Sequence, residues 1–150
     1  MTSIVLACGN ALRGDDGVAL YLARRLYGAI RDAETKIVCS HQWLPEQAED
    51  LSRASLAVFI DASISIPPGQ IRVQPVLADE RGAGVTTHVV SPPGLMTLAR
   101  EVFAVAPKKA FLVTIGGASF EHGGGLSEPV RAAIPGALKK ICELLSRCGA

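Results

Sequence analysis

Two carboxylates stand together in a glycine-bordered segment near the N-terminus. The segment ACGNALRGDDGVAL, residues 7–20, has the glycine spacing of a phosphate-binding loop at Gly9 and Gly14, and continues with Asp15 and Asp16. A phosphate-binding loop would have Lys and then Ser or Thr at those two positions. Carboxylates repel phosphate, and the chain also lacks a G-x-G-x-x-G fingerprint. The segment therefore argues against nucleotide binding, and its carboxylates need another role.

Two further side chains could complete a site. Asp61 ends the apolar run LAVFIDAS, residues 56–63, and His88 lies in TTHVV. An acid that ends so apolar a run must be paired, hydrogen-bonded or at a functional edge. Two carboxylates and an imidazole form a metal-binding set with open positions. The structural alternative is that these carboxylates accept hydrogen bonds from backbone amides at the start of a helix, and it applies to Asp15 more than to Asp16.

Short apolar runs typical of strands alternate with segments of helical spacing. We predict strands at 3–8, 35–40, 56–63, 70–76 and 109–117. We predict helices from Asp15 onward, over 44–54 with Pro45 in the first turn, over 91–103, and over 126–148 with a kink at Pro135. Pro75 favours an edge position for the fourth strand, because proline cannot donate to a central ladder. The alternation predicts one α/β domain over 1–150, with a mostly parallel sheet and helices on both faces.

The order of the elements converts chain position into spatial position. Ligands of an open parallel sheet bind outside the carboxyl ends of its strands. Asp15 and Asp16 follow the first predicted strand, Asp61 ends the third, and His88 follows the fourth. We therefore expect these side chains at one edge of the sheet. Three other side chains follow strands and could approach the same edge, with roles left open: His41, Glu121 and His122.

The composition fits a compact domain without a strongly charged partner. The 150 residues are 49% hydrophobic and 19% charged, with a net charge of +1 and scattered Lys and Arg. Nothing in this balance indicates binding to nucleic acid or to an anionic membrane. No segment reaches the roughly 18 apolar residues of a membrane span, and the N-terminus lacks the features of a signal peptide. We expect a cytoplasmic chain whose partners are small molecules or proteins.

The sequence gives little support for a hydrolase that uses a cysteine or serine nucleophile. The four cysteines form no C-x-x-C pair or zinc-finger spacing, so we expect free thiols: Cys8, Cys39, Cys142 and Cys148. A Cys–His hydrolase built on Cys8 with His41 or His88 is disfavoured, because Cys8 lies inside an apolar run without visible activation. No G-x-S-x-G elbow of a serine hydrolase occurs.

Three separated motifs, ACGNALRGDDG, VFIDAS and TTHVVSP, resemble the maturation endopeptidases of nickel–iron hydrogenases. Their order matches the family, and GGASFEHGGGLSEPV is similar to the family's last loop and helix start. Ala7 and Ala19 depart from the pattern, since family members usually carry Gly at the first position and often at the second. Alanine leaves room for the turn provided that φ stays negative.

The resemblance implies a three-layer α/β/α sandwich around a mainly parallel sheet of about five strands. It also implies an endopeptidase that removes the C-terminal extension of a nickel–iron hydrogenase large-subunit precursor after nickel insertion. The family's metal-contacting and catalytic residues fall on Asp16, Asp61 and His88. We expect no permanently bound cofactor, although a divalent ion such as cadmium or zinc could occupy the site in place of the substrate's nickel. A monomer is expected.

Two other functions stay open at this stage. The same residues would serve a non-catalytic binding or chaperone-like module for the nickel-loaded precursor. A nucleotide-binding regulator would be recognised by a rise in melting temperature with ATP or GTP, which we do not expect. For the endopeptidase, hydrolysis could use a metal-polarised carbonyl or water, or an aspartate as general base on water.

Overall fold

The computed structural model describes residues 2–30, 33–78 and 90–149, with only the backbone at 147–149. In these ranges the strands are β1 (Ser3–Cys8), β2 (Thr35–Ser40), β3 (Leu56–Ser63), β4 (Ile71–Pro75) and β5 (Lys109–Gly116). The helices are the 3-10 turn η1 (Gly14–Gly17), α1 (Val18–Ala29), α2 (Gln47–Ser52), α3 (Pro92–Phe103) and α4 (Glu128–Gly149). Each predicted strand and helix is present, and Pro135 lies within α4.

Two helices start three residues later than predicted. The helix expected from Asp15 begins with the η1 turn, and α1 follows from Val18. The helix expected over 44–54 is confined to α2, so the assignment of Pro45 to its first turn is wrong. The Leu44 N–H donates to the Gln47 side-chain oxygen at 2.8 Å, and the Gln47 N–H donates to the Leu44 carbonyl at 3.0 Å. These local bonds hold a turn where the helix was expected.

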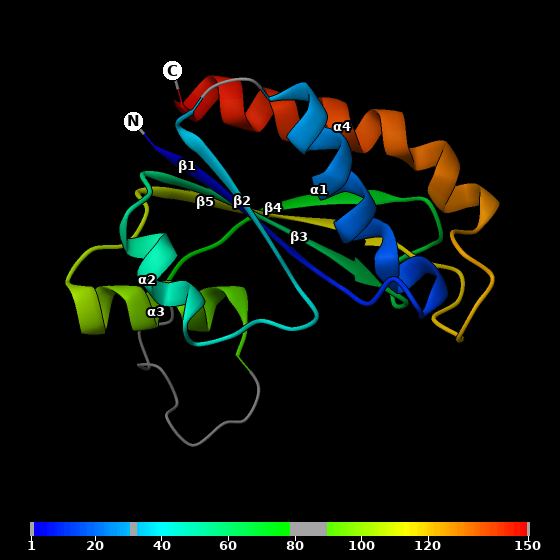
Figure 1. The fold of residues 1–150 in the computed structure, drawn as a ribbon, viewed down its shortest axis with the longest axis horizontal. Coiled ribbons are helices and arrows are strands. Elements are labelled where there is room, and N and C mark those ends of the chain that lie inside the picture. The colour runs from blue at the N-terminus through cyan, green and yellow to red at the C-terminus, as the bar shows by residue number, and fades with distance from the viewer. Residues whose placement is uncertain (1, 31–32, 79–89, 150) are drawn as a thin grey trace.

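The strands form one sheet in the order β2-β1-β3-β5-β4 (Figure 1). Strands β2, β1, β3 and β5 run parallel to one another, and β4 pairs antiparallel with β5 at one edge. The edge position predicted from Pro75 is confirmed. Parallel strands joined through helices bring their carboxyl ends to a common edge. The loops after β1, β3 and β5 therefore meet there.

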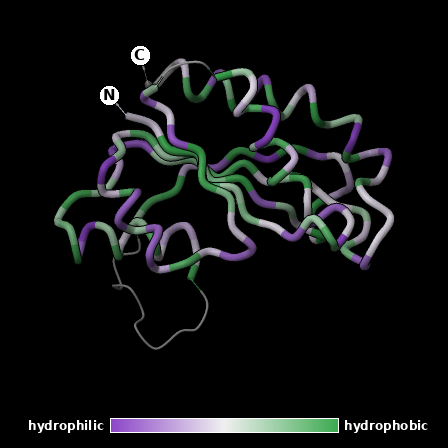
Figure 2. Tube along the Cα trace, viewed as in Figure 1, coloured by the Kyte–Doolittle hydropathy of each residue, from purple (hydrophilic) through white to green (hydrophobic). Residues whose placement is uncertain are grey.

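Helices cover both faces of the sheet, with α1 and α4 on one side and α2 and α3 on the other (Figure 1). Successive residues of β3 point to opposite faces of the sheet. Val58 and Ile60 pack with α1 and α4, whereas Ala57 and Phe59 pack with α2 and α3. Figure 2 shows the hydrophobic strands at the centre between the layers. This is the predicted three-layer α/β/α sandwich around a mainly parallel five-stranded sheet, and burial on both faces explains why its central strands are continuously apolar.

The two departures from the resembled motif fit the backbone. Ala7 and Ala19 are fully buried, and neither has a positive φ, which Ala104 alone shows among the described non-glycine residues. Small side chains satisfy both positions without strain, as the sequence predicted. Within the described ranges, no helix combines the length and apolar character needed to cross a membrane.

Candidate functional site

Asp16 and Asp61 lie near each other at the carboxyl ends of two neighbouring strands. Asp16 belongs to η1, which follows β1, and Asp61 lies in the last half of β3. Ala7 pairs with Ile60, so the next residues, Cys8 and Asp61, lie side by side on β1 and β3. Asp61 shares the strand face of Phe59, which is the α2/α3 side of the sheet. The predicted convergence of these two carboxylates is confirmed.

The environment of Asp61 favours proton uptake near neutral pH. Its side chain is half-buried and follows five fully buried residues of β3. Burial, together with the negative charge of Asp16, raises the pKa of Asp61 to about 6, although the Ala62 N–H donates to Asp61 Oδ1 at 2.8 Å and opposes the shift. A carboxylate of this kind is ionised at neutral pH and still accepts a proton readily. It can therefore act as a general base or as a metal ligand.

Backbone packing fixes the position of Asp16. Its Oδ2 accepts a hydrogen bond from the Asn10 N–H at 3.1 Å. A side chain at Gly9 would overlap the carbonyl oxygen of Asp16, so only glycine allows this close approach. A phosphate-binding loop would offer such an amide to phosphate, whereas here the chain's own carboxylate occupies it. The local geometry agrees with the argument against nucleotide binding.

Asp15 is a structural residue. It is 1% exposed, and its carboxylate accepts four hydrogen bonds from the loop between β5 and α4. The donors are the backbone N–H groups of Ala118 (2.8 Å), Ser119 (3.3 Å) and Ser127 (2.7 Å), and the Ser127 hydroxyl (2.8 Å). Burial alone would raise the pKa of Asp15, but these hydrogen bonds outweigh it and hold the pKa below its usual value. Asp15 is therefore structural, but the predicted way is wrong: its carboxylate binds amides of a distant loop and not those of the helix that follows it.

Cys8 lies beside the carboxylates but is not an activated nucleophile. Burial, and then the charges of Asp61 and Asp16, raise the pKa of the Cys8 thiol to about 12. A thiol of this kind stays protonated at neutral pH, so the case against a Cys–His hydrolase holds. Cys39 and Cys142 are also free thiols, as predicted, and the side chain of Cys148 is outside the described part of the chain.

The histidine candidates occupy different places. His88 lies outside the described residues, so its predicted position at this edge stays a prediction. His41 is exposed just after β2. His122 and Glu121 line an open cleft of about 550 Å³ together with Arg13, Ile64, Phe120 and neighbouring residues of the β5–α4 loop. Neither Asp16 nor Asp61 lines this cleft. Within the described ranges, no three His, Cys, Asp or Glu side chains gather as a metal-binding group.

The cleft contains residues that the sequence analysis did not single out. Arg13 comes from the loop before η1, and its Nε donates to the Phe120 carbonyl at 3.3 Å across 107 positions of the chain. Ile64 follows the last residue of β3 and is 61% exposed. Arg13 stands beside the DDG residues, which was a usable signal. Phe120 and Ile64 carried no such signal, because their place in the cleft depends on the tertiary arrangement of the loops.

No protein-family model and no curated protein matches the chain. Solved structures do match. The hydrogenase maturating endopeptidase HybD from E. coli is 25% identical, with a TM-score of 0.77 over 99% of this chain and 94% of that one. A hydrogenase 2 maturation peptidase from a Thaumarchaeota archaeon is 25% identical, with a TM-score of 0.72 over 97% of this chain and 99% of that one. The likeness to hydrogenase maturation endopeptidases is thus confirmed, and it extends over nearly the whole chain.

Proposed function

We propose that this chain is an endopeptidase of hydrogenase maturation. It removes the C-terminal extension of a nickel–iron hydrogenase large-subunit precursor after nickel insertion, acting as a monomer in the cytoplasm. The observation that carries the proposal is the pairing of Asp16 and Asp61 at the carboxyl edge of a fold shared with a hydrogenase maturating endopeptidase over 99% of the chain. In such folds ligands bind at that edge.

The nickel in this proposal belongs to the substrate. Asp16, Asp61 and His88 contact the ion held in the precursor and thereby test whether its insertion is complete. Carboxylate oxygen and neutral imidazole nitrogen are suitable donors for divalent nickel. The same donors accept cadmium or zinc, so discrimination comes from the precursor's own nickel site. The enzyme itself holds no permanent cofactor.

The raised pKa of Asp61 favours general-base hydrolysis over a purely metal-driven route. Asp61 would take a proton from a water molecule as the water oxygen attacks the scissile carbonyl carbon. The tetrahedral intermediate then breaks its carbon–nitrogen bond, and the proton passes from Asp61 to the leaving amine. The pKa of about 6 belongs to Asp61 before the precursor binds, and it leaves this base ionised at neutral pH, ready to take the proton from water.

The test uses purified chain with a nickel-loaded large-subunit precursor and, in parallel, the same precursor without nickel. Mass spectrometry of the large subunit reports the length of its tail. Loss of a defined C-terminal peptide only from the loaded sample supports both the peptidase and the nickel checkpoint. An intact tail in the cognate loaded precursor would instead favour the binding-module alternative.

Two variants connect the activity to the proposed residues. Asp16→Asn and His88→Ala are expected to stop processing while retaining the fold, as checked by circular dichroism. Wild-type processing rates in either folded variant would contradict the assigned contacts with nickel.

A further inference from the structure

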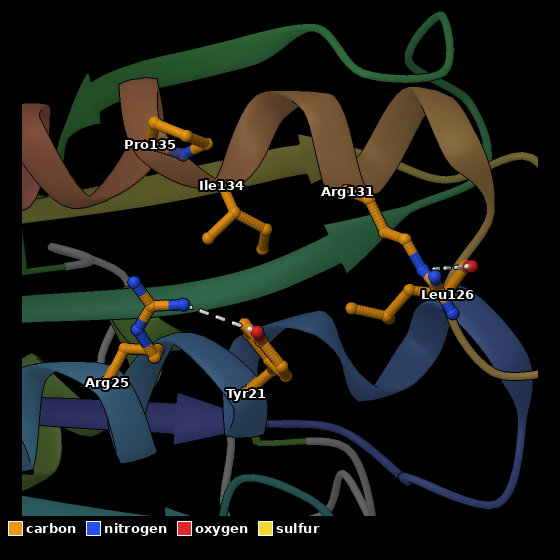
Figure 3. A pocket seen from close by; sticks show the side chains of 6 residues that line it. All are labelled: Tyr21, Arg25, Leu126, Arg131, Ile134 and Pro135. Atoms are coloured by element: carbon orange, nitrogen blue, oxygen red, sulfur yellow. Dashed lines mark hydrogen bonds between the residues drawn. The ribbon is translucent and has the colours of Figure 1, made fainter.

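A second concave surface lies between α1 and α4, on the outer side of one helical layer (Figure 3). We call it the α1–α4 groove; its lining residues are Tyr21, Arg25, Leu126, Arg131, Ile134 and Pro135. Its volume is about 560 Å³, within the range of roughly 300–1,000 Å³ usual for binding pockets. Among the described residues, the lining has two cations and no acid. The groove is therefore suited to an anionic partner.

Each of the two arginines is anchored by a hydrogen bond. Arg25 Nη1 donates to the Tyr21 hydroxyl at 3.3 Å, and its guanidinium carbon lies 6.0 Å from the Tyr21 ring centroid. Arg131 Nε donates to the Leu126 carbonyl at 3.1 Å, and both hydrogen bonds are drawn in Figure 3. Neither guanidinium forms an ion pair within the described part of the chain. Their remaining N–H groups can receive carboxylates.

The floor of the groove is apolar. Ile134 is 6% exposed, Leu126 is half-buried, and Pro135 lies beside them on α4. Arginine and tyrosine are enriched where protein partners bind most strongly, and an apolar centre with a polar rim is the usual anatomy of such surfaces. The groove therefore matches a peptide segment that carries acidic side chains next to an apolar one.

The groove adjoins the elements that hold the candidate site. Tyr21 follows Asp16 by five residues, which is roughly 8 Å along a helix. Leu126 precedes Ser127, whose N–H and hydroxyl both bind Asp15. Asp61 faces the other layer, but the groove borders the first turns of α1 and α4, so a protein bound at the carboxyl edge of the sheet can reach both.

We propose that the α1–α4 groove docks an acidic segment of the precursor that is separate from the bond that is cut. This inference rests on the proposed function, because the precursor is the partner it names. Docking at the groove does not use the substrate's nickel. The groove therefore binds nickel-free precursor as well, whereas cleavage requires the loaded form.

Binding of nickel-free precursor, measured by biolayer interferometry, tests the groove without cleavage. Arg25→Glu combined with Arg131→Glu is expected to raise Kd about tenfold, since each exposed contact is lost and replaced by repulsion. The same variant is expected to raise KM for cleavage of loaded precursor. Wild-type affinity falls as salt rises from about 0.05 to 0.3 M, and the variant loses most of that salt dependence.

The matched control reverses two exposed arginines elsewhere, Arg24→Glu with Arg100→Glu. Arg24 is close enough to Cys39 on β2 to affect its pKa, and Arg100 lies on α3, across the sheet from the groove. This control has the same change in net charge and is expected to alter Kd less than twofold. Because Arg131 also holds the Leu126 carbonyl, Arg25→Glu alone is measured too, with an expected threefold to fivefold rise.

The outcomes separate the two proposals. Equal Kd values for groove and control variants, both folded, overturn the groove proposal even when cleavage proceeds. Binding that depends on Arg25 without cleavage of loaded precursor supports the groove and contradicts the peptidase. Absence of both binding and cleavage in the wild type overturns both.

Discussion

The two adjacent aspartates give a sharp test of the structural reasoning. Asp15→Asn and Asp16→Asn make the same chemical change at neighbouring positions. We expect Asp15→Asn to destabilise the fold strongly and to retain processing well below its melting temperature. We expect Asp16→Asn to leave stability within about 0.5 kcal/mol of the wild type and to abolish processing.

The magnitude follows from the hydrogen bonds of Asp15. Oδ2 accepts from Ala118, Ser119 and the Ser127 hydroxyl, and Oδ1 accepts from the Ser127 N–H. The amide oxygen of asparagine can replace only one of the two carboxylate oxygens. The NH₂ group of the asparagine then occupies the other oxygen's position and faces an N–H donor. One buried donor without a partner costs about 1–3 kcal/mol, and the remaining bonds lose their charge assistance. We expect a loss of about 3 kcal/mol, or roughly 6–12 °C in Tm for a chain of this size.

Asp16 is the matched control because its carboxylate is half-buried and, among the described residues, accepts one hydrogen bond, from the Asn10 N–H. An asparagine oxygen can keep that bond, and removing the charge relieves its repulsion with Asp61. Urea and thermal unfolding of the two variants measure the difference. Equal destabilisation, or an Asp15→Asn variant as stable as the wild type, would refute the distinction between a structural and a functional aspartate.

The pKa of Asp15 predicts how this difference changes with pH. The folded-state pKa lies below the ordinary value of 3.8, so the ionised carboxylate stabilises the fold. That contribution is fully present above about pH 4 and is lost as pH falls through the folded-state pKa. The stability gap between wild type and Asp15→Asn is therefore constant from pH 7 to 5 and narrows toward pH 2. A gap that widens on acidification would contradict the assignment.

Three further predictions concern the candidate site. Asp61→Asn should stop processing. It should also raise the free energy of unfolding by about 1–2 kcal/mol at pH 8 but not at pH 4, measured by thermal unfolding. The reason is that a folded-state pKa of about 6 makes ionisation of Asp61 cost stability as pH rises through 6. For the wild type, kcat/KM should fall about tenfold per pH unit below about pH 6, and a flat profile down to pH 4.5 would exclude Asp61 as the base. Gly9→Ala should lower Tm and processing together by displacing the backbone of Asp16, whereas Gly28→Ala, with nothing within 4 Å of the added carbon, should stabilise α1 by about 0.5–1 kcal/mol.

Much of the architecture could be predicted because the decisive signals are local. Continuous apolar runs identify strands buried on both faces, and Pro75 marks an edge because it lacks a donor. The convergence of Asp16 and Asp61 followed from a rule about parallel sheets, which needs only the order of the elements. For the same reason, the three-layer arrangement was accessible from alternation alone.

The features that could not be predicted depend on contacts between distant segments. Asp15 finds its donors more than 100 positions away, so its sequence neighbours suggested the amides of the next helix instead. The α1–α4 groove combines Tyr21 with Arg131, and neither helix alone contains it. The late start of α2 arises from one side-chain bond of Gln47, which competes with the helix locally.

The electrostatics of the carboxylate pair suggest why the proposed enzyme would distinguish loaded from empty precursor. Burial is the main reason that the pKa of Asp61 lies near 6, and repulsion by the Asp16 carboxylate adds to it. A divalent ion reaching the pair would convert this repulsion into attraction and hold both groups ionised. An empty precursor brings no such compensation, so the desolvation that accompanies docking would push Asp61 toward its protonated, inactive form. On this argument the checkpoint needs no moving part, because the charge on the substrate's nickel sets the protonation state of the base.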